Sequence, residues 1–140
     1  MANIAELANK MKETEQLFHS IHFGAVSGEG SSFDGLHLLF SDLYTDLFEK
    51  YDDVIELAYS VGETPALGAI PAMPYKKFTA PEALKIAEAE YGKLIDLAVK
   101  LFNDFSGNTA NDIAVQDLLG GLIAGWHKEL NYKIKHRLNK

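Results

Sequence analysis

All four prolines of this 140-residue chain fall between residues 65 and 81. Because proline lacks an amide donor and clashes with the preceding helical turn, this segment is expected to be mostly irregular. On both sides of it, apolar residues recur at steps of three, four and seven, which is the spacing of an amphipathic helix. No segment has the convincing character of a strand, so the sequence predicts an all-α fold that the proline segment divides in two.

The first half predicts two helices joined by a short loop. One spans about residues 3–23, and Gly24 is a residue at which helices commonly end. The other spans about residues 32–61, with Ser32 as its N-cap and Gly62 as its end.

The second half predicts another pair of helices. The third helix is expected to begin at an N-cap, Thr79, with Pro81 just inside it, and to end at Gly107. The fourth is expected to begin near Thr109 or Asn111 and to fray into a basic tail. Its core-facing residues are expected to include Ile113, Leu118, Leu122 and Trp126.

The order of short and long connections predicts the architecture. A short loop, a long crossover and a second short loop between four long helices are typical of a ferritin-like four-helix bundle with one long crossover, here between helices two and three. The length suits one domain with a sizeable core. We therefore expect a single domain over residues 1–140, with residues 133–140 as a basic C-terminal tail.

Composition narrows the class of protein. The net charge is −7, but residues 128–140 hold five basic side chains and one acidic one, a local +4, which leaves −11 for the rest. The absence of cysteine excludes disulfides, iron–sulfur clusters and thiolate zinc sites. No apolar run has the length of a membrane span or the character of a signal peptide, so we expect a cytoplasmic protein.

Three of the five histidines, His19, His22 and His37, surround the first loop. On the second helix, Glu49, Asp52 or Asp53, and Glu56 are spaced to share one face, where like charges repel and a hard cation would offset the repulsion. The alternative to a metal site is that the histidines only pack at the edge of the core and that the acidic residues form an ordinary solvated helix face.

His37 precedes Asp52 by 15 residues on the same helix, a separation of ~22 Å at the helical rise per residue. One protomer therefore cannot bring the two side chains together. Two antiparallel copies of the helix could do so across a two-fold axis near residues 44–47, where Tyr44, Leu47 and Phe48 offer apolar contact, and the pair would form two equivalent sites.

With these residues the chain resembles the Dps family, the mini-ferritins, over nearly its whole length. In "HSIHF", His22 matches the histidine that ends the family's first helix, and Phe23 stands where tryptophan is usual. In "GLHLLFSDL", His37 matches the second histidine. In "YDDVIEL", Asp52 and Glu56 match the two carboxylates that the neighbouring subunit supplies.

The chain also departs from the family pattern. The family's aspartate one turn after the second histidine falls on Ser41, and the adjacent Asp42 projects about 100° away on an ideal helix. The loop between the histidines is about three residues longer than usual. His19 stands where family members sometimes carry another polar residue, and we expect it to support the site rather than to bind metal.

The resemblance implies a ferroxidase and iron-storage protein that protects against oxidation. His22 and His37 of one subunit would meet Asp52 and Glu56 of its neighbour around at most two iron ions, with peroxide or dioxygen as oxidant. The family assembles from dimers into a hollow dodecamer that holds the ferric product. Candidate residues for a three-fold pore are Asp104, Asp112 and Asp117.

Two alternatives remain beside this hypothesis. The basic tail could bind DNA through phosphate contacts, with Lys133, Lys135, Arg137 and Lys140 as candidates, in a shell whose ferroxidase site is weakened or absent because of Ser41. A bacterioferritin or di-iron oxygenase needs Glu-x-x-His on two helices. No histidine of this chain follows a glutamate by three residues, which disfavours that class.

Overall fold

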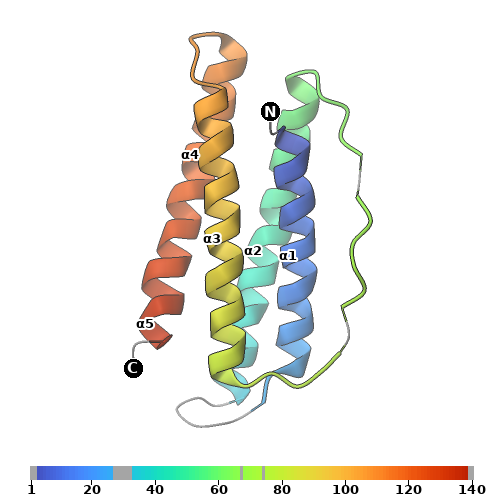
Figure 1. The fold of residues 1–140 in the computed structure, drawn as a ribbon, viewed down its shortest axis with the longest axis vertical. Helices are drawn as coiled ribbons and strands as arrows, with labels where there is room; N and C mark the ends of the chain where they lie inside the picture. Colours follow the sequence, from blue (N-terminus) through green and yellow to red (C-terminus); the bar gives the residue numbers. More distant parts are fainter. Residues whose placement is uncertain (1–2, 27–32, 67, 74, 139–140) are drawn as a thin grey trace.

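The protein is described from a computed structural model that covers residues 3–26, 33–66, 68–73 and 75–138. The described part of the chain is helical and contains no strand, which confirms the all-α prediction (Figure 1). Its elements, in order, are α1 (Ile4–Gly24), α2 (Phe33–Ser60), α3 (Ala80–Asp104), α4 (Ala110–Lys128), the π-helical segment η1 (Glu129–Ile134) and α5 (Lys135–Leu138).

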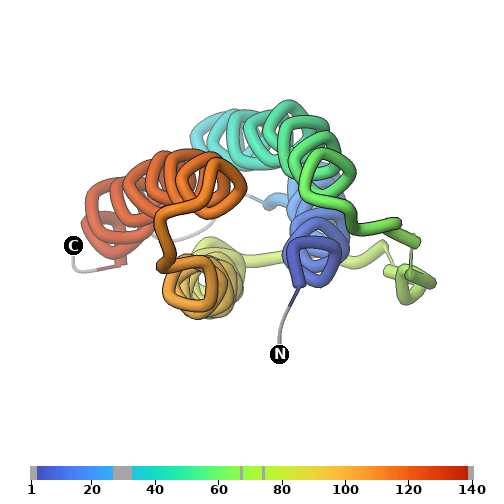
Figure 2. Tube along the Cα trace, turned by 90° about the horizontal axis from the view of Figure 1, so that it is seen from above, coloured from blue at the N-terminus to red at the C-terminus, as the bar shows by residue number. Residues whose placement is uncertain are grey.

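The four long helices form an antiparallel bundle. Seen along its axis in Figure 2, the helices lie at the four corners, and the crossover after α2 passes outside α1. Figure 1 shows this crossover running the length of α1 before α3 begins. The bundle with one long crossover is therefore confirmed. Its connectivity places the end of α1, the start of α2 and the C-terminal helical segment at the same end of the molecule.

Local sequence signals fix most of the helix boundaries. The Thr79 side chain accepts a hydrogen bond from the amide of Glu82 and so caps α3, as predicted. Thr109 caps α4 through a capping box with Asp112. The α2 helix ends as predicted just before Gly62, whose φ of 89° lies in the left-handed region that favours glycine. The predicted N-cap Ser32 lies outside the described residues.

The crossover is fastened to the end of α1. The Phe78 amide donates to the carbonyl of Gly24 at 2.7 Å, and the Val26 amide donates to the carbonyl of Phe78 at 3.2 Å. A Cβ atom at residue 24 would lie 2.0 Å from the Lys76 carbonyl oxygen. Only glycine admits this close backbone approach, so Gly24 both ends α1 and seats the crossover.

The core lies along the bundle axis, but the phase predicted for α4 was partly wrong. Ile113 is 60% exposed, whereas Val115 and Leu119 are buried with Leu122 and Trp126. At ~100° per residue, a position nine residues before Leu122 falls on the opposite side of the helix. The core-facing residues of α4 therefore follow one another at steps of four, three and four, and are Val115, Leu119, Leu122 and Trp126.

The C-terminal segment does not fray as predicted. It continues as helix through η1 and α5 to Leu138. Leu130 and Ile134 are buried against the bundle and hold this segment in place. Residues 133–138 of the predicted tail are thus part of the helical body. None of the described helices has the length and apolar character needed to cross a membrane.

Candidate metal centre

His22, at the end of α1, and His37, in the second turn of α2, stack on each other. Their ring centroids are 3.7 Å apart and their planes are inclined by 23°. His22 Nδ1 lies 2.8 Å from the His37 carbonyl oxygen, and His37 Nδ1 lies 2.8 Å from the His22 carbonyl oxygen. The structure thus brings together the two histidines that the sequence predicted as a pair.

These two hydrogen bonds define the tautomer of both rings. A carbonyl oxygen can only accept, so each Nδ1 must carry the proton and donate it. In a neutral imidazole the other nitrogen, Nε2, then keeps its lone pair. A backbone carbonyl bonded to the distal ring N–H is the usual support of a metal-binding histidine. The free Nε2 nitrogens of His22 and His37 could therefore each act as a metal ligand.

Two aromatic side chains flank the pair and were not predicted to do so. Phe33 stacks on His37 with centroids 4.9 Å apart, and Tyr44 meets His22 edge-on at 5.3 Å. Phe33 lies four residues before His37 and Tyr44 lies seven after it, so the three side chains share a helix face. That spacing is the signal that could have identified them.

His19 is packed between two aromatic rings. Its ring stacks on Tyr44 at 4.1 Å and on Phe23 at 4.8 Å, and lies 6.1 Å from the ring of His22. This placement suits the supporting role that we expected for His19. Phe23 itself is 59% exposed, although it is a large apolar residue directly beside the histidine pair.

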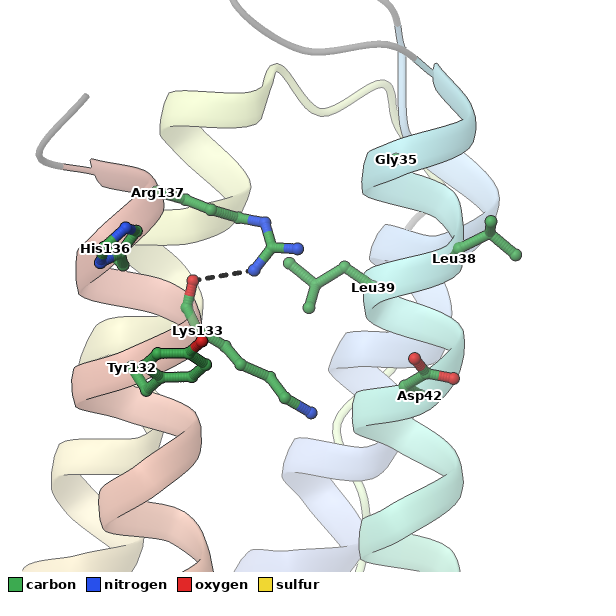
Figure 3. Close-up of a pocket in the computed structure, with 8 residues that line it drawn as sticks. All are labelled: Gly35, Leu38, Leu39, Asp42, Tyr132, Lys133, His136 and Arg137. Atoms are coloured by element: carbon green, nitrogen blue, oxygen red, sulfur yellow. Dashed lines mark hydrogen bonds between the residues drawn. The ribbon is translucent and has the colours of Figure 1, made fainter.

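Ser41 and Asp42 have different surroundings. Ser41 is half-buried one turn after His37, at the position where the family pattern has an aspartate. Asp42 is exposed and lines a groove of about 600 Å³ between α2 and the C-terminal helical segment (Figure 3). The groove also contains Leu38 and Leu39 of α2 and Lys133 and Arg137 of the C-terminal helical segment.

Asp52 and Glu56 are exposed on α2, four residues apart, and neither forms an ion pair within the described part of the chain. The nearby Tyr51 has its hydroxyl pKa raised by burial and, secondarily, by the charge of Asp52. Among the described residues there is no group of three or more histidines, cysteines, aspartates and glutamates that could hold a metal ion. One protomer therefore does not bring the histidines and these carboxylates together in its described region.

The three residues suggested for a pore have separate environments. Asp104 ends α3 and is exposed, and Asp117 is exposed on α4. Asp112 accepts a hydrogen bond from the Thr109 amide at 3.2 Å, so its carboxylate is part of the capping box at the N-terminus of α4.

Two of the four basic C-terminal residues proposed for DNA binding, Lys133 and Arg137, have partners within the chain. Lys133 Nζ lies 3.0 Å from Glu129 Oε1, and Arg137 donates to the Lys133 carbonyl at 2.9 Å (Figure 3). Lys135 is half-buried in α5. Lys140 lies outside the described residues.

Comparison with known proteins agrees with this architecture. The family model of the ferritin-like domain matches residues 4–136. Dps from Staphylococcus aureus superimposes with a TM-score of 0.76 at 19% identity, over 99% of this chain and 98% of that one. Dps from Listeria innocua soaked with cobalt gives 0.67 at 22% identity, over 100% and 94% of the two chains.

The same Listeria innocua protein soaked with zinc gives a TM-score of 0.64 at 23% identity, over 99% of this chain and 97% of that one. A comparison with functionally curated proteins gave no match. Because the family model spans nearly the whole sequence, the chain belongs to the ferritin-like domain family, and its fold is that of the Dps proteins.

Proposed function

We propose that the protein oxidises Fe(II) at sites shared by two copies of the chain and holds the Fe(III) product inside an oligomeric shell. The observation that carries this proposal is the tautomer of His22 and His37. Each ring donates its Nδ1 proton to a backbone carbonyl at 2.8 Å, which leaves the Nε2 nitrogen of each ring available to bind an ion.

In this proposal iron is the substrate. Fe(II) accepts mixed nitrogen and oxygen ligands, so the Nε2 atoms of His22 and His37 would bind it from one protomer. Asp52 and Glu56 of a second protomer would supply negative charge, and Glu56 could bridge two ions. Peroxide or dioxygen would accept the electrons. The structures of Listeria innocua Dps soaked with cobalt and with zinc support a metal-binding role for this fold.

The sharing of sites requires a two-fold pairing of α2. Among the large apolar side chains that this helix presents to solvent, Leu38, Phe48 and Tyr59 are 62%, 57% and 59% exposed. These residues offer contact area along the face that carries the acids. Leu47, which the sequence suggested as a contact, is fully buried in the core of its own protomer, so Phe48 is the better candidate for the centre of the interface.

The test is the oxidation of Fe(II) by the purified protein, followed by absorbance under peroxide and under air. The protein should be faster than buffer, and a variant carrying His37→Ala and Asp52→Ala should lose this advantage. Asp53→Ala is the matched control, because Asp53 is an exposed neighbour on a different part of the helix surface. Equal rates for the wild type and the double variant, with both assembled, would reject the site.

DNA binding by the C-terminal segment is a second proposal, favoured by the exposed Arg137, which lines the groove in Figure 3, and by the half-buried Lys135 of the same helix. Removing the segment would be a poor test, because Ile134 is fully buried and its loss would damage the core. A variant with Lys135→Gln and Arg137→Gln keeps the helix and removes two charges.

In a gel shift at low salt, this variant should bind DNA more weakly than the wild type, because each lost phosphate contact lowers the affinity. A variant with Lys85→Gln and Lys100→Gln loses the same charge from exposed sites on α3 and serves as the control. Equal weakening in both variants would mean that only the net charge matters.

A further inference from the structure

Tyr44 of α2 lies within a row of ring side chains that passes through the histidine pair. At one end of the row, Phe33 stacks on His37 at 4.9 Å, and His37 stacks on His22 at 3.7 Å. Tyr44 meets His22 edge-on at 5.3 Å and stacks on His19 at 4.1 Å, with the two planes inclined by 20°. These distances join ring centroids and are those of rings in contact. The Tyr44 ring therefore touches a proposed metal ligand.

Tyr44 differs from its neighbours in this row in its redox chemistry. Among the described residues, the rings that contact the histidine pair from outside are those of Phe33, Tyr44, His19 and Phe23. Phenyl and imidazole rings are difficult to oxidise, whereas a phenol gives up an electron readily when it loses its proton at the same time. The chain has no cysteine, and its one tryptophan, Trp126, is fully buried in the core. Tyr44 is therefore the side chain best suited to donate an electron to an ion on His22.

The metal site needs such a donor when it holds a single ion. Reduction of peroxide to two waters takes two electrons, and one Fe(II) supplies only one of them. With one electron, peroxide splits into hydroxide and a damaging hydroxyl radical. Ser41 lies one turn after His37, where the family pattern has an aspartate, so a second ion has one anionic ligand fewer. A site with one ion has to obtain the second electron from the protein.

We propose that Tyr44 supplies this second electron, an inference that rests on the proposed function. One Fe(II), one peroxide, the Tyr44 phenol and one proton give Fe(III), two waters and a neutral tyrosyl radical. The O–O bond breaks, and the iron and the phenol each lose one electron. The phenolic proton and one proton from solvent complete the two waters. A further Fe(II) and a proton then restore the phenol, so that two Fe(II) are oxidised per peroxide and no hydroxyl radical is released.

The surroundings of Tyr44 suit this role. The side chain is half-buried and packs against the hydrophobic core, which limits the access of solvent to a radical on its ring. His19 and His22 contact the ring from α1, and they fix its position relative to the pair. His19 thus holds the electron donor in place, which gives the supporting role expected for it a specific content.

Electron paramagnetic resonance of freeze-quenched samples tests the proposal. The assembled protein is loaded with one Fe(II) per chain without oxygen and is mixed with one equivalent of peroxide. The wild type should show Fe(III) together with a tyrosyl radical, whose signal narrows when the protein contains ring-deuterated tyrosine. Tyr44→Phe keeps the ring but not the phenol, so it should lose the radical signal. A spin trap should then detect several-fold more hydroxyl radical from this variant than from the wild type.

Tyr132→Phe is the matched control, because Tyr132 is 67% exposed on η1 and its ring lies against that of His136. It should keep the radical signal of the wild type. Titration with Co(II) shows whether Tyr44→Phe still binds metal, and we expect an unchanged affinity. Loss of the radical together with Co(II) binding would make Tyr44 a positioning residue and overturn the electron transfer.

The outcomes also separate this inference from the proposed function. A wild type that oxidises Fe(II) faster than buffer but forms no tyrosyl radical would overturn the role of Tyr44 and leave the iron site standing. An equally strong radical in Tyr44→Phe would do the same. A wild type no faster than buffer would reject the proposed function, and the role of Tyr44 with it.

Discussion

His22 and His37 stand fifteen residues apart in the chain, and each donates its Nδ1 proton to the other's backbone carbonyl across the α1–α2 seam. These two hydrogen bonds fix the orientation of both rings, because each ring is held by a backbone carbonyl and not by a mobile side chain. The position of each Nε2 atom is therefore fixed by backbone contacts, which is the preorganisation that the proposed metal site would need.

The sharing of sites between protomers predicts complementation. His37→Ala and Asp52→Ala should each be inactive as pure assemblies, because every site lacks one ligand. When the two are co-expressed in equal amounts, half of the dimers pair the two variants, and each of these keeps one intact site. About a quarter of the wild-type rate of Fe(II) oxidation should return. A mixed assembly no faster than the single variants would show that the sites are not shared in this way.

Replacing Ser41 by aspartate should strengthen metal binding. Ser41 lies one turn after His37 and is half-buried, so a carboxylate there can reach an ion held by the histidines. We expect the dissociation constant for Co(II), measured by absorbance titration, to fall by about tenfold. Asp42→Asn should leave it unchanged, since Asp42 lines the groove shared with the C-terminal helical segment. An equal affinity for Ser41→Asp and wild type would mean that this position does not face the metal.

Gly24→Ala should destabilise the protein. Its Cβ would lie 2.0 Å from the Lys76 carbonyl, so the crossover must move and its backbone hydrogen bonds with residues 24 and 26 weaken. The expected loss is about 1–3 kcal/mol in the free energy of unfolding, measured by urea denaturation.

Gly121→Ala is the matched substitution within α4, where nothing lies within 4 Å of the new Cβ. It should stabilise by about 0.5–1 kcal/mol through helix propensity. Equal effects of the two substitutions on the free energy of unfolding would show that the close contact between Gly24 and the Lys76 carbonyl has no role in stability.

Stability should fall steeply above about pH 10. Burial, with a smaller contribution from the charges of Glu129 and Asp46, raises the pKa of Tyr91 well above its ordinary value of 10.0. Burial lowers the pKa of Lys10, but its hydrogen bond and ion pair with Glu90 outweigh burial and raise that pKa above 10.5. In both cases the unfolded chain releases the proton first. The folded state therefore binds more protons over this interval, and alkali favours unfolding.

The Tyr91→Phe variant isolates one part of this pH dependence. Above pH 10 its unfolding free energy should decline less steeply than that of the wild type, by up to about 1.4 kcal/mol per pH unit for the one proton removed. Urea denaturation between pH 9 and 11.5 measures the two slopes. Identical slopes would show that Tyr91 ionises as easily in the folded protein as in the unfolded one.

Local sequence signals predicted the helices well. Thr79 and Thr109 each accept from the amide three residues ahead, and Gly24 and Gly62 mark helix ends. These signals work because a cap depends only on a few adjacent residues. The errors fell where packing decides. Ile113 was assigned to the core but is exposed, and the C-terminal residues to 138 stay helical because buried Ile134 anchors them.

The candidate site was predicted in part. His22 and His37 were paired from the sequence, and they do meet. Their supporting contacts, with Phe33 and Tyr44, were not foreseen. The assignment of Asp52 and Glu56 as ligands from a second protomer remains a prediction, because it depends on how two chains pack.

The sequence by itself determined four long helices, a proline-rich crossover and which residue types stand at each turn, since helical periodicity, capping and proline stereochemistry act over a few residues. Only the tertiary structure decided that two imidazoles stack at 3.7 Å with both Nδ1 atoms on carbonyls, and that Tyr91 is fully buried in the core. Such contacts join residues far apart in the chain. They depend on the rotation and vertical offset of one helix against another, which side-chain packing across the whole bundle sets.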